Sequence, residues 1–471
     1  MLDDAHLDRL IKAYDVRGVV PDDLTPEIAR LVGAAFVRVL GIATADGGPG
    51  AVVVGRDMRP SGPDLVAAFA AGATSQGVDV VDIGLASTDQ LYYAAGSLDL
   101  PGAMFTASHN PAQYNGIKLC RAGASPVGQE TGLREIRDLV QVWSGEGVPA
   151  HDGGPGTVSH RDLLADYAAF LNSLVPLGGS RPLSVVVDAG NGMGGHTVPA
   201  VLAGLPLTIT PLYFELDGTF PNHEANPIDP ENLRDLQAAV LEHGADLGLA
   251  FDGDADRCFV VDEKGGLVDP STLTALIAVR ELAKAPGSPI IHNLITSAAV
   301  PEIVLEHGGV PVRTRVGHSF IKARMAETGA VFGGEHSGHF YFRDFWCADS
   351  GMLAALHTLA ALGETPAGTT LSSLLAQYSR YVASGEINST VTDPQAVLAT
   401  LRTTYGDRPG VTLDELDGLT VAGTSEAGLW WFNVRPSNTE PLLRLNAEGA
   451  TAALMASVRD EVLAIIRGDH A

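Results

Sequence analysis

The amino-acid sequence predicts an α/β protein with three consecutive α/β domains, whose sheets are mixed, and a smaller C-terminal α+β domain, all around one central cleft. Short apolar runs that resemble buried strands alternate with amphipathic helical stretches, which is typical of layered α/β units. A chain of 471 residues is also too long for a single hydrophobic core. From about Glu386 the pattern changes, because several strands are mixed with only two helices.

The first domain is predicted over residues 1–155. AVVVG at 51–55 and VDVVDIG at 78–84 have the composition of buried strands, and the stretch between them has helical spacing. A third strand, GAMFTAS at 102–108, runs directly into a polar loop. The glycine-rich, polar segment at 144–156 indicates the end of this domain.

The second domain is predicted over residues 156–264, with strands LSVVVDA at 183–189 and ADLGLAF at 245–251. The third domain, residues 265–375, repeats the alternation of helix and strand. The fourth domain, residues 376–471, is the smaller α+β domain.

The chain is strongly acidic, with 56 Asp and Glu against 30 Lys and Arg and a formal net charge of -26. Most of its surface should repel nucleic acid and anionic membranes, so an anionic substrate would require a local cluster of Arg and Lys. The three cysteines are far apart and odd in number, which indicates a reducing compartment. We expect a cytoplasmic protein, because the N-terminus does not resemble a secretory signal and no apolar run reaches about 20 residues.

The first candidate site is TASHNP at 106–111, directly after a predicted strand. Ser108 is therefore expected at the carboxyl edge of a parallel sheet, where ligand sites of α/β proteins form. His109 and Lys118 could supply proton transfer and neutralise an anion. A plain polar turn would explain this segment equally well when it is taken alone.

The second candidate site is DGDADR at 252–257, between two predicted strands. Alternate side chains of an extended loop face the same way, so Asp252, Asp254 and Asp256 would repel one another unless a cation neutralised them. Three carboxylates with room for one more oxygen suit Mg²⁺. An EF-hand loop is the competing interpretation, but Arg257 stands where that loop needs glycine, and strands rather than helices flank it.

A further alternative concerns GNGMGG at 190–195, which formally matches the GxGxxG pattern of dinucleotide-binding proteins. A tight turn between a strand and a helix requires glycines for backbone reasons as well. We interpret the segment as a structural turn, with cofactor binding as the alternative.

Two later loops are also polar. GEHSGH at 334–339 places Glu335 and Ser337 where they could hold neighbouring sugar hydroxyls, although a polar turn explains this segment better when it is taken alone. RPSNTEP at 435–441, with Arg444 after it, predicts a phosphate cradle of hydroxyl, amide and guanidinium donors. Tyr14, Arg17 and His318 are weaker candidates, since each could lie in an ordinary surface loop.

The four motifs TASHNP, DGDADR, GEHSGH and RPSNTEP, in this order and spacing, resemble those of the α-D-phosphohexomutase family. The resemblance covers essentially the whole chain, and within the family the pattern is most similar to bacterial phosphomannomutase/phosphoglucomutase. Four ordered motifs are far more specific than any one of them.

The resemblance implies a role for each matched residue. Ser108 would be the phosphoserine, and its phosphate would complete the Mg²⁺ shell of Asp252, Asp254 and Asp256. Arg17, His109 and Lys118 would surround the transferred group, while Glu335 and Ser337 would hold sugar hydroxyls. The non-reacting phosphate would be held by Arg435, Ser437, Asn438 and Thr439, with Arg444 nearby, and Tyr14, Arg257 and His318 would line the cleft.

The implied reaction is reversible phosphoryl transfer between O1 and O6 of a hexose phosphate, either mannose or glucose, with a hexose 1,6-bisphosphate as intermediate and activator. Phosphoglucosamine mutase is an alternative within the family, and a phosphoserine-dependent sugar phosphatase is an alternative from another class. The expected partner is the small phosphosugar substrate, and the oligomeric state stays open.

The sequence also departs from the family pattern. Ala255 stands where glycine is common, which should be tolerated if the backbone there is not left-handed. Leu294 stands where some relatives place a lysine, which puts that substrate contact in doubt. His336 occupies a position that varies between subfamilies.

Overall fold

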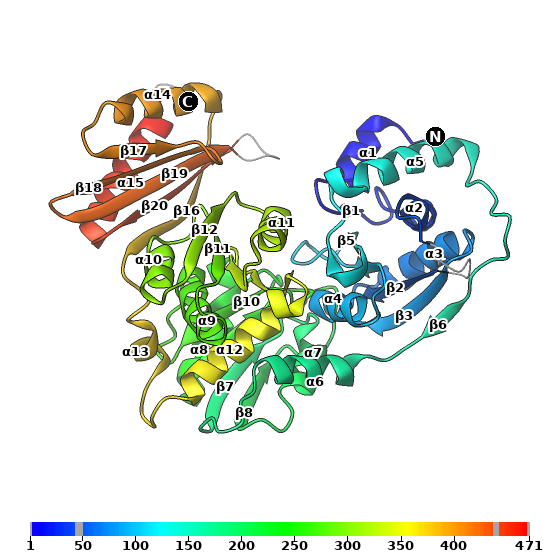
Figure 1. Cartoon of the computed structure of the whole chain (residues 1–471), viewed down its shortest axis with the longest axis horizontal. Coiled ribbons are helices and arrows are strands. Elements are labelled where there is room, and N and C mark those ends of the chain that lie inside the picture. Colours follow the sequence, from blue (N-terminus) through cyan, green and yellow to red (C-terminus); the bar gives the residue numbers. More distant parts are fainter. Residues whose placement is uncertain (1, 43–49, 437–441, 469–471) are drawn as a thin grey trace. The chain divides into compact units, whose positions relative to one another are not determined.

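The computed structural model of the chain describes residues 2–42, 50–436 and 442–468, and at 318 and 319 it describes the backbone alone (Figure 1). Contacts group the chain into two compact units, and each is described by itself. Unit 1 runs up to Val268 and includes Ser337–Ser372, whereas unit 2 comprises Asp269–His336 and the chain from Ser373 onward.

The first sheet of unit 1 has the strand order β1-β5-β4-β2-β3-β6. The pairs are parallel from β4 through β2 and β3 to β6. Strand β5 runs antiparallel to both of its neighbours, β1 and β4. The loops that follow β2 and β4 therefore emerge at the same sheet edge, as the sequence predicted for Ser108. The strands are β1 Val16–Val19, β2 Ala51–Arg56, β3 Asp79–Leu85, β4 Gly102–Phe105, β5 Tyr114–Cys120 and β6 Val158–His160.

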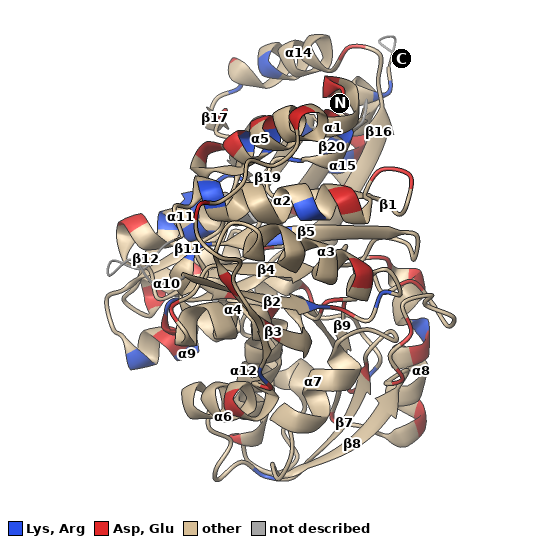
Figure 2. Cartoon of the chain, turned by 90° about the vertical axis from the view of Figure 1, so that its right-hand side faces the viewer, with Lys and Arg blue, Asp and Glu red and all other residues tan. Residues whose placement is uncertain are grey.

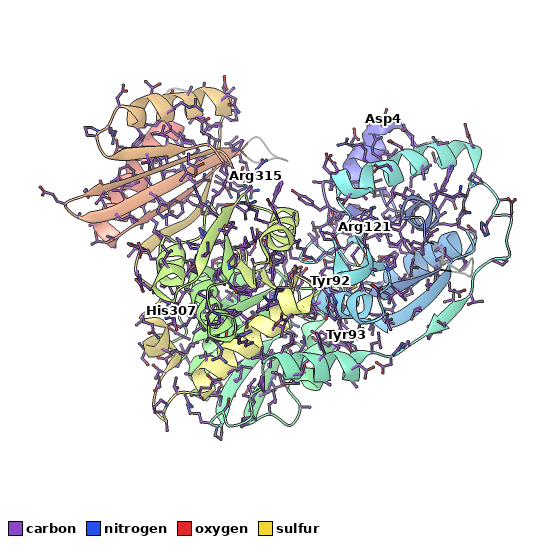
Figure 3. All side chains as sticks on the ribbon, viewed as in Figure 1. Asp4, Tyr92, Tyr93, Arg121, His307 and Arg315 are labelled. Atoms are coloured by element: carbon purple, nitrogen blue, oxygen red, sulfur yellow. The ribbon has the colours of Figure 1, made fainter. Side chains whose placement is uncertain are left out.

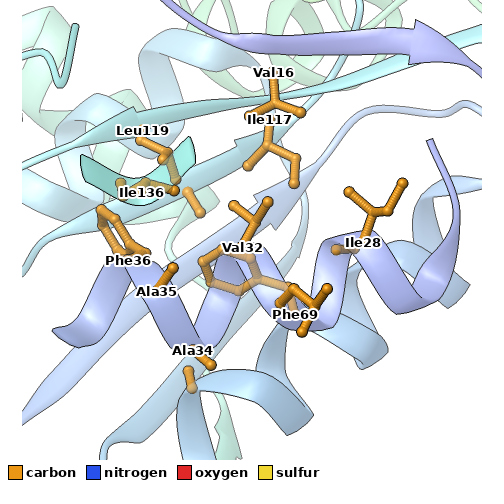
Figure 4. Packing of buried hydrophobic residues seen from close by; sticks show 14 of the residues in the cluster. Val16, Ile28, Val32, Ala34, Ala35, Phe36, Phe69, Ile117, Leu119 and Ile136 are labelled. Atoms are coloured by element: carbon orange, nitrogen blue, oxygen red, sulfur yellow. The ribbon is translucent and has the colours of Figure 1, made fainter. Parts of the chain in front are cut away.

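The helices of this sheet are α1 Asp4–Leu10, α2 Pro26–Val39, α3 Gly62–Thr74, α4 Thr88–Ser97 and α5 Leu133–Glu146. Helix α2 shows why they fold against it: Ile28, Val32 and Phe36 recur every four residues and lie on one face. That face is buried with Phe69 of α3 and Ile117 of β5 (Figure 4).

The second sheet of unit 1 has the order β10-β9-β7-β8, with β10 antiparallel to β9 and the other pairs parallel. Its strands are β7 Leu183–Asp188, β8 Leu207–Leu212, β9 Leu247–Phe251 and β10 Cys258–Asp262. The accompanying helices are α6 Leu164–Leu174, α7 Gly194–Val201 and α8 Arg234–His243. The later segment of unit 1 contributes β14 Phe340–Phe342, β15 Ala348–Asp349 and helix α12 Gly351–Gly363.

Aromatic side chains hold α4, α6 and the segment before β15 together. The ring centroid of Tyr93, labelled beside Tyr92 in Figure 3, lies 5.9 Å from that of Tyr167 and 6.3 Å from that of Trp346. Such edge-on ring pairs add to the apolar burial. Helix α4 is thus packed against elements from two other parts of unit 1.

Unit 2 contains three parallel strands, β11 Pro289–Asn293, β12 Val310–Thr314 and β13 Phe332–Gly334, with β11 between the other two. Their helices are α9 Pro270–Lys284, α10 Ala299–Glu306 and α11 His318–Thr328. The rest of the unit is an antiparallel sheet of order β16-β20-β19-β18-β17. Its elements are β16 Val382–Thr390, α14 Pro394–Gly406, β17 Val411–Asp414, β18 Leu419–Ser425, β19 Gly428–Pro436, β20 Leu442–Gly449 and α15 Ala452–Ile466, and the short helix α13 Leu371–Leu375 precedes them.

Several helices begin at a residue whose side chain accepts a hydrogen bond from a backbone N–H of the first turn. Thr25 does so for α2, Ser87 for α4, Asp269 for α9, Ser350 for α12 and Thr451 for α15. These caps satisfy donors that the helix itself leaves unpaired.

The predicted fold class is confirmed: mixed sheets with helices make up most of the chain, and an antiparallel α+β part ends it. Acidic residues are spread over outer helices such as α5 and α8, as the net charge requires (Figure 2). Within the described ranges, every helix is too short or too polar to span a bilayer.

Candidate active site

Ser108 lies in the loop between β4 and β5, and its backbone is left-handed, with φ 49°. This conformation costs an L-residue about 1–2 kcal/mol, so other contacts must hold it. Its amide donates to Thr106 Oγ1 at 2.8 Å, and its own hydroxyl donates to Asp252 Oδ2 at 2.8 Å. His109 Nδ1 lies 3.1 Å from the same hydroxyl.

The acid loop connects β9 to β10 and brings Asp252, Asp254 and Asp256 together. All three side chains are buried, and one ligand atom from each lies within 4.8 Å of the others. Two cations approach them: Lys118 Nζ, from β5, lies 2.7 Å from Asp254 and 2.6 Å from Asp256, and Arg257 Nε lies 2.9 Å from Asp252. The structure therefore brings together the serine, the three acids and the lysine that the sequence singled out.

Glycines allow this close approach. A Cβ at Gly253 would lie 2.4 Å from the carbonyl oxygen of Ser108, and a Cβ at Gly192 would lie 2.7 Å from the carbonyl oxygen of Gly253. The amide of Met193 also donates to that Gly253 carbonyl at 2.9 Å. The GNGMGG turn thus packs against the acid loop, which favours the structural interpretation of its glycines.

The acid loop has the donors that a hard cation needs. Asp254 Oδ1 and Asp256 Oδ1 are buried, and neither has a hydrogen-bond partner among the described residues. A buried carboxylate oxygen destabilises the fold unless it accepts a hydrogen bond, pairs with a cation or coordinates a metal. The residues present therefore fit a divalent cation with a preference for oxygen ligands.

The pKa values of the charged groups in the acid loop show how strongly their charges interact. Burial, together with the charges of Asp256 and Asp254, raises the pKa of Asp252 to about 7, although Arg257 acts against the shift. Burial also opposes ionisation of Asp254, but the charge of Lys118 and its hydrogen bond lower the pKa of that carboxyl. Both Asp254 and Asp256 raise the pKa of Lys118 despite its burial, so it remains an ammonium.

Arg17 contacts the loop between β4 and β5 that carries Ser108, and His109 belongs to that loop. Arg17, on β1, donates to Asn110 Oδ1 at 2.6 Å and to Asp15 Oδ2 at 3.1 Å. Burial and the positive charges of Arg257 and Arg17 lower the pKa of His109 to about 2, which keeps its ring neutral. Tyr14 lies in the turn before β1, in the same unit.

His339, which the sequence analysis quoted within GEHSGH without a role, lies beside the acids. Its Nδ1 is 3.0 Å from Asp349 Oδ2 and 3.8 Å from Asp256 Oδ1. Burial opposes protonation, but these two carboxylates raise the pKa of His339. Thr88 was missed as well, since no local pattern indicates that its hydroxyl donates to Asp254 Oδ2 at 2.5 Å.

The remaining predicted sugar and phosphate residues lie mostly in unit 2. Glu335 is buried, and its Oε1 accepts from the amide of Gly317 at 3.2 Å, next to His318, whose side chain is not described. Ser337 belongs to unit 1.

In the predicted cradle, Arg435 Nη2 lies 3.0 Å and Arg444 Nη1 lies 3.3 Å from the carboxylate of Glu386. Ser437, Asn438 and Thr439 lie outside the described residues.

Comparison with known proteins gives a consistent result along the chain. Four domain models described as phosphoglucomutase/phosphomannomutase match it: alpha/beta/alpha domain I at residues 8–144, domain II at 165–266, domain III at 269–381 and the C-terminal domain at 386–465.

Curated proteins of similar sequence carry related names. The chain is 42% identical over 461 residues to a protein of Xanthomonas campestris named phosphohexose mutases, which covers 97% of this chain and 99% of that protein. It is 39% identical over 465 residues to a phosphomannomutase of Escherichia coli, with 97% and 98% coverage. A crystal structure of a phosphoglucomutase/phosphomannomutase family protein from Burkholderia thailandensis matches with a TM-score of 0.85 at 31% identity, over 100% of this chain and 99% of that one.

Proposed function

Because the chain belongs to the phosphoglucomutase/phosphomannomutase family, we propose that it moves a phosphoryl group between O1 and O6 of hexose phosphates by way of phosphorylated Ser108. One observation carries this assignment. The Ser108 hydroxyl lies 2.8 Å from Asp252 Oδ2, beside two more buried carboxylates and an ammonium. A phosphate on that oxygen would lie against the cation site and Lys118, where phosphoryl transfer requires positive charge.

We propose Mg²⁺ as the cation held by Asp252, Asp254 and Asp256, with an oxygen of the Ser108 phosphate as a further ligand. Three carboxylates without nitrogen or sulfur ligands suit a small hard cation that also binds phosphate. When bound, Mg²⁺ would offset charge on the transferring group.

The residues of the chain would then act in fixed roles. Lys118 keeps its proton and contributes positive charge beside the transferring group. His109 Nδ1 lies 3.1 Å from Ser108 Oγ, the oxygen that would carry the phosphoryl group, whereas His339 lies beside the acid loop and Asp349 orients its ring. We therefore assign His339 to accept the proton of the attacking sugar hydroxyl.

The reaction would proceed in two matched halves. The free hydroxyl of a hexose monophosphate bonds to the phosphorus of phosphoserine, the bond from phosphorus to Ser108 Oγ breaks, and His339 takes the hydroxyl proton. The resulting 1,6-bisphosphate turns end for end, Ser108 Oγ takes the other phosphoryl group, and the proton returns to the released sugar oxygen. The phosphate cradle would hold the phosphate that is not reacting in each half.

The test is the loss of Ser108 itself. Ser108→Ala should abolish mutase turnover of mannose 1-phosphate and glucose 1-phosphate, and intact mass should show no phosphate on the protein. Ser159→Ala, on the exposed strand β6, serves as the control and should keep full activity. Undiminished turnover by Ser108→Ala would overturn the proposal.

The same turnover measurement, extended to glucosamine 1-phosphate, determines which sugar phosphate is preferred. We propose mannose phosphate as the preferred substrate, in line with the names of the curated relatives. Free inorganic phosphate instead of isomerised sugar would identify a phosphatase.

A further inference from the structure

Arg59 is the largest fully buried side chain among the described residues, and it lies in unit 1 directly after β2. Its guanidinium can donate five hydrogen bonds in a fixed fork. All five have an acceptor: Nε donates to Asp57 at 3.2 Å, Nη1 to the carbonyls of Pro111 and Tyr114, both at 2.8 Å, and Nη2 to those of Ser108 at 2.9 Å and Asn110 at 2.7 Å.

Four of these five acceptors are backbone carbonyls: three belong to the loop from β4 to β5 that carries Ser108, and the fourth is that of Tyr114, the first residue of β5. Backbone carbonyls of irregular segments lack the regular partners that helices and sheets supply, although the Pro111 carbonyl also accepts from the amide of Tyr114 at 3.0 Å. Arg59 donates to these four carbonyls and thereby fixes the relative positions of four peptide groups within seven residues. The left-handed Ser108 is one of those held residues.

Asp57 fixes Arg59 in turn. Its carboxylate accepts from the amide of Arg59 at 3.0 Å as well as from Nε, and it is hydrogen-bonded to Thr106. Thr106 Oγ1 accepts from the amide of Ser108 at 2.8 Å. Arg59 thus contacts the loop that carries Ser108 directly through backbone carbonyls, and Asp57 is connected to the Ser108 amide through Thr106.

Elements of the second sheet close the other side of Arg59. The ring of Phe220 lies 5.2 Å from the guanidinium carbon, and a Cβ at Gly218 would lie 2.7 Å from Arg59 Cα. These contacts and the five hydrogen bonds enclose the Arg59 side chain, which is fully buried.

We propose that Arg59 is the positioning residue for the nucleophile: it holds the loop in the conformation that aims Ser108 Oγ at the acid loop before substrate arrives. This inference rests on the proposed role of Ser108. Arg59 touches the loop only through its backbone, so it should affect phosphoryl transfer far more than sugar binding. A misplacement of about 1 Å can cost roughly 100-fold in rate.

The experiment compares Arg59→Lys and Arg59→Met with wild type. Lysine has three donors without the planar fork of a guanidinium, so it can replace only some of the five hydrogen bonds that Arg59 donates. We expect kcat to fall about 10-fold in Arg59→Lys and about 100-fold in Arg59→Met, with KM for mannose 1-phosphate within about threefold of wild type. Transfer from hexose 1,6-bisphosphate to Ser108, followed by intact mass, should slow by the same factors.

Two further variants separate positioning from lost stability. Phe36→Leu should lower the stability of the hydrophobic core that packs on the first sheet of unit 1 (Figure 4). It leaves the loop that carries Ser108 unchanged, so it should keep wild-type kcat. If Arg59→Met fails to fold because Asp57 is left as a buried unpaired charge, Asp57→Asn with Arg59→Met removes that charge and should show the same loss of kcat.

Three outcomes would overturn the inference while wild type is an active mutase: full kcat in Arg59→Met, a loss confined to KM, or an equal loss in Phe36→Leu. Absence of mutase activity in wild type would instead contradict the proposed function.

Discussion

Ala255 in the acid loop has a left-handed backbone, with φ 58°, although its side chain is buried. The expectation that alanine would be tolerated there depended on a backbone that is not left-handed, and the structure does not meet that condition. Two effects of similar size then oppose each other. The conformation costs alanine about 1–2 kcal/mol, and its buried methyl returns about 0.8 kcal/mol.

Ala255→Gly should therefore change the free energy of unfolding by less than about 0.5 kcal/mol, since glycine relieves the backbone but loses the methyl and gains unfolded-state freedom. Ala250→Gly, in strand β9 of the same hairpin and equally buried, has no such relief and should lose about 1.5–2 kcal/mol. Denaturant unfolding in EDTA measures both. Equal losses would show that the left-handed backbone carries no strain.

Glu386 in unit 2 places a carboxylate between Arg435 and Arg444, where the cradle should receive a phosphate. Phosphate must share the two guanidiniums with this anion. Glu386→Gln should lower KM for the sugar phosphate about threefold, a modest change because the group is partly exposed. Glu415→Gln, which breaks the separate pair with Arg402, should leave KM unchanged. A rise of KM in Glu386→Gln would mean that the carboxylate instead holds the arginines in place.

At the scale of elements, Asp89 at the start of α4 joins three helices. It accepts hydrogen bonds from Ser87, from Tyr167 of α6 at 2.7 Å and from Ser350 before α12 at 2.7 Å. Burial raises the pKa of Asp89 to about 6 in spite of these bonds. The folded protein thus binds the proton more tightly than the unfolded chain.

The stability from protonated Asp89 is fully present below its unfolded pKa of about 3.9 and is lost as the pH rises through about 6. Relative to Asp89→Asn, wild type should lose up to about 3 kcal/mol of unfolding free energy between pH 4 and pH 7. Denaturant unfolding across this range provides the measurement. Asp166→Asn, exposed on α6, is the matched control: the difference in unfolding free energy between it and wild type should not change with pH. A pH-independent difference for Asp89→Asn as well would contradict the argument.

Element prediction from the sequence succeeded where apolar runs were continuous. The strand expected at 183–189 is β7 Leu183–Asp188, and the one expected at 245–251 contains β9 Leu247–Phe251. Strands β5 and β8 were not identified. In β5, Asn115, Gly116 and Lys118 interrupt the apolar pattern, and Pro211 does so in β8, so pairing with neighbours rather than composition defines them.

The same distinction applies to the site. Ser108, Lys118 and the three aspartates, which the structure brings together, could be singled out as candidates because each lies in a short motif after or within a strand. Arg59 could not, since its acceptors lie about fifty residues away and are backbone atoms that no side-chain pattern encodes. His339 was visible in its motif, but its partner Asp349 becomes apparent only when β14 and β15 pair.

At the scale of the whole molecule, the net charge of -26 is the dominant property. Like charges spread over the outer helices (Figure 2) destabilise the compact state, and salt screens them beyond about 10 Å. Raising NaCl from 20 to 200 mM at pH 7.5 should therefore raise Tm by about 2 °C. Near the sequence pI of about 4.8 the repulsion is gone. Calorimetry at that pH should show no rise of Tm with added NaCl. Equal increases of Tm at both pH values would exclude net repulsion as the cause.

The left-handed backbone of Ser108 restricts which amino acid can take the role of nucleophile that we propose for this position. Threonine carries the same hydroxyl and can accept a phosphoryl group, so chemistry alone would permit either residue. A β-branched side chain at φ 49° is, however, a genuine outlier among protein conformations. The loop thereby selects serine over threonine through its backbone, and a phosphothreonine form of this enzyme would require a different loop.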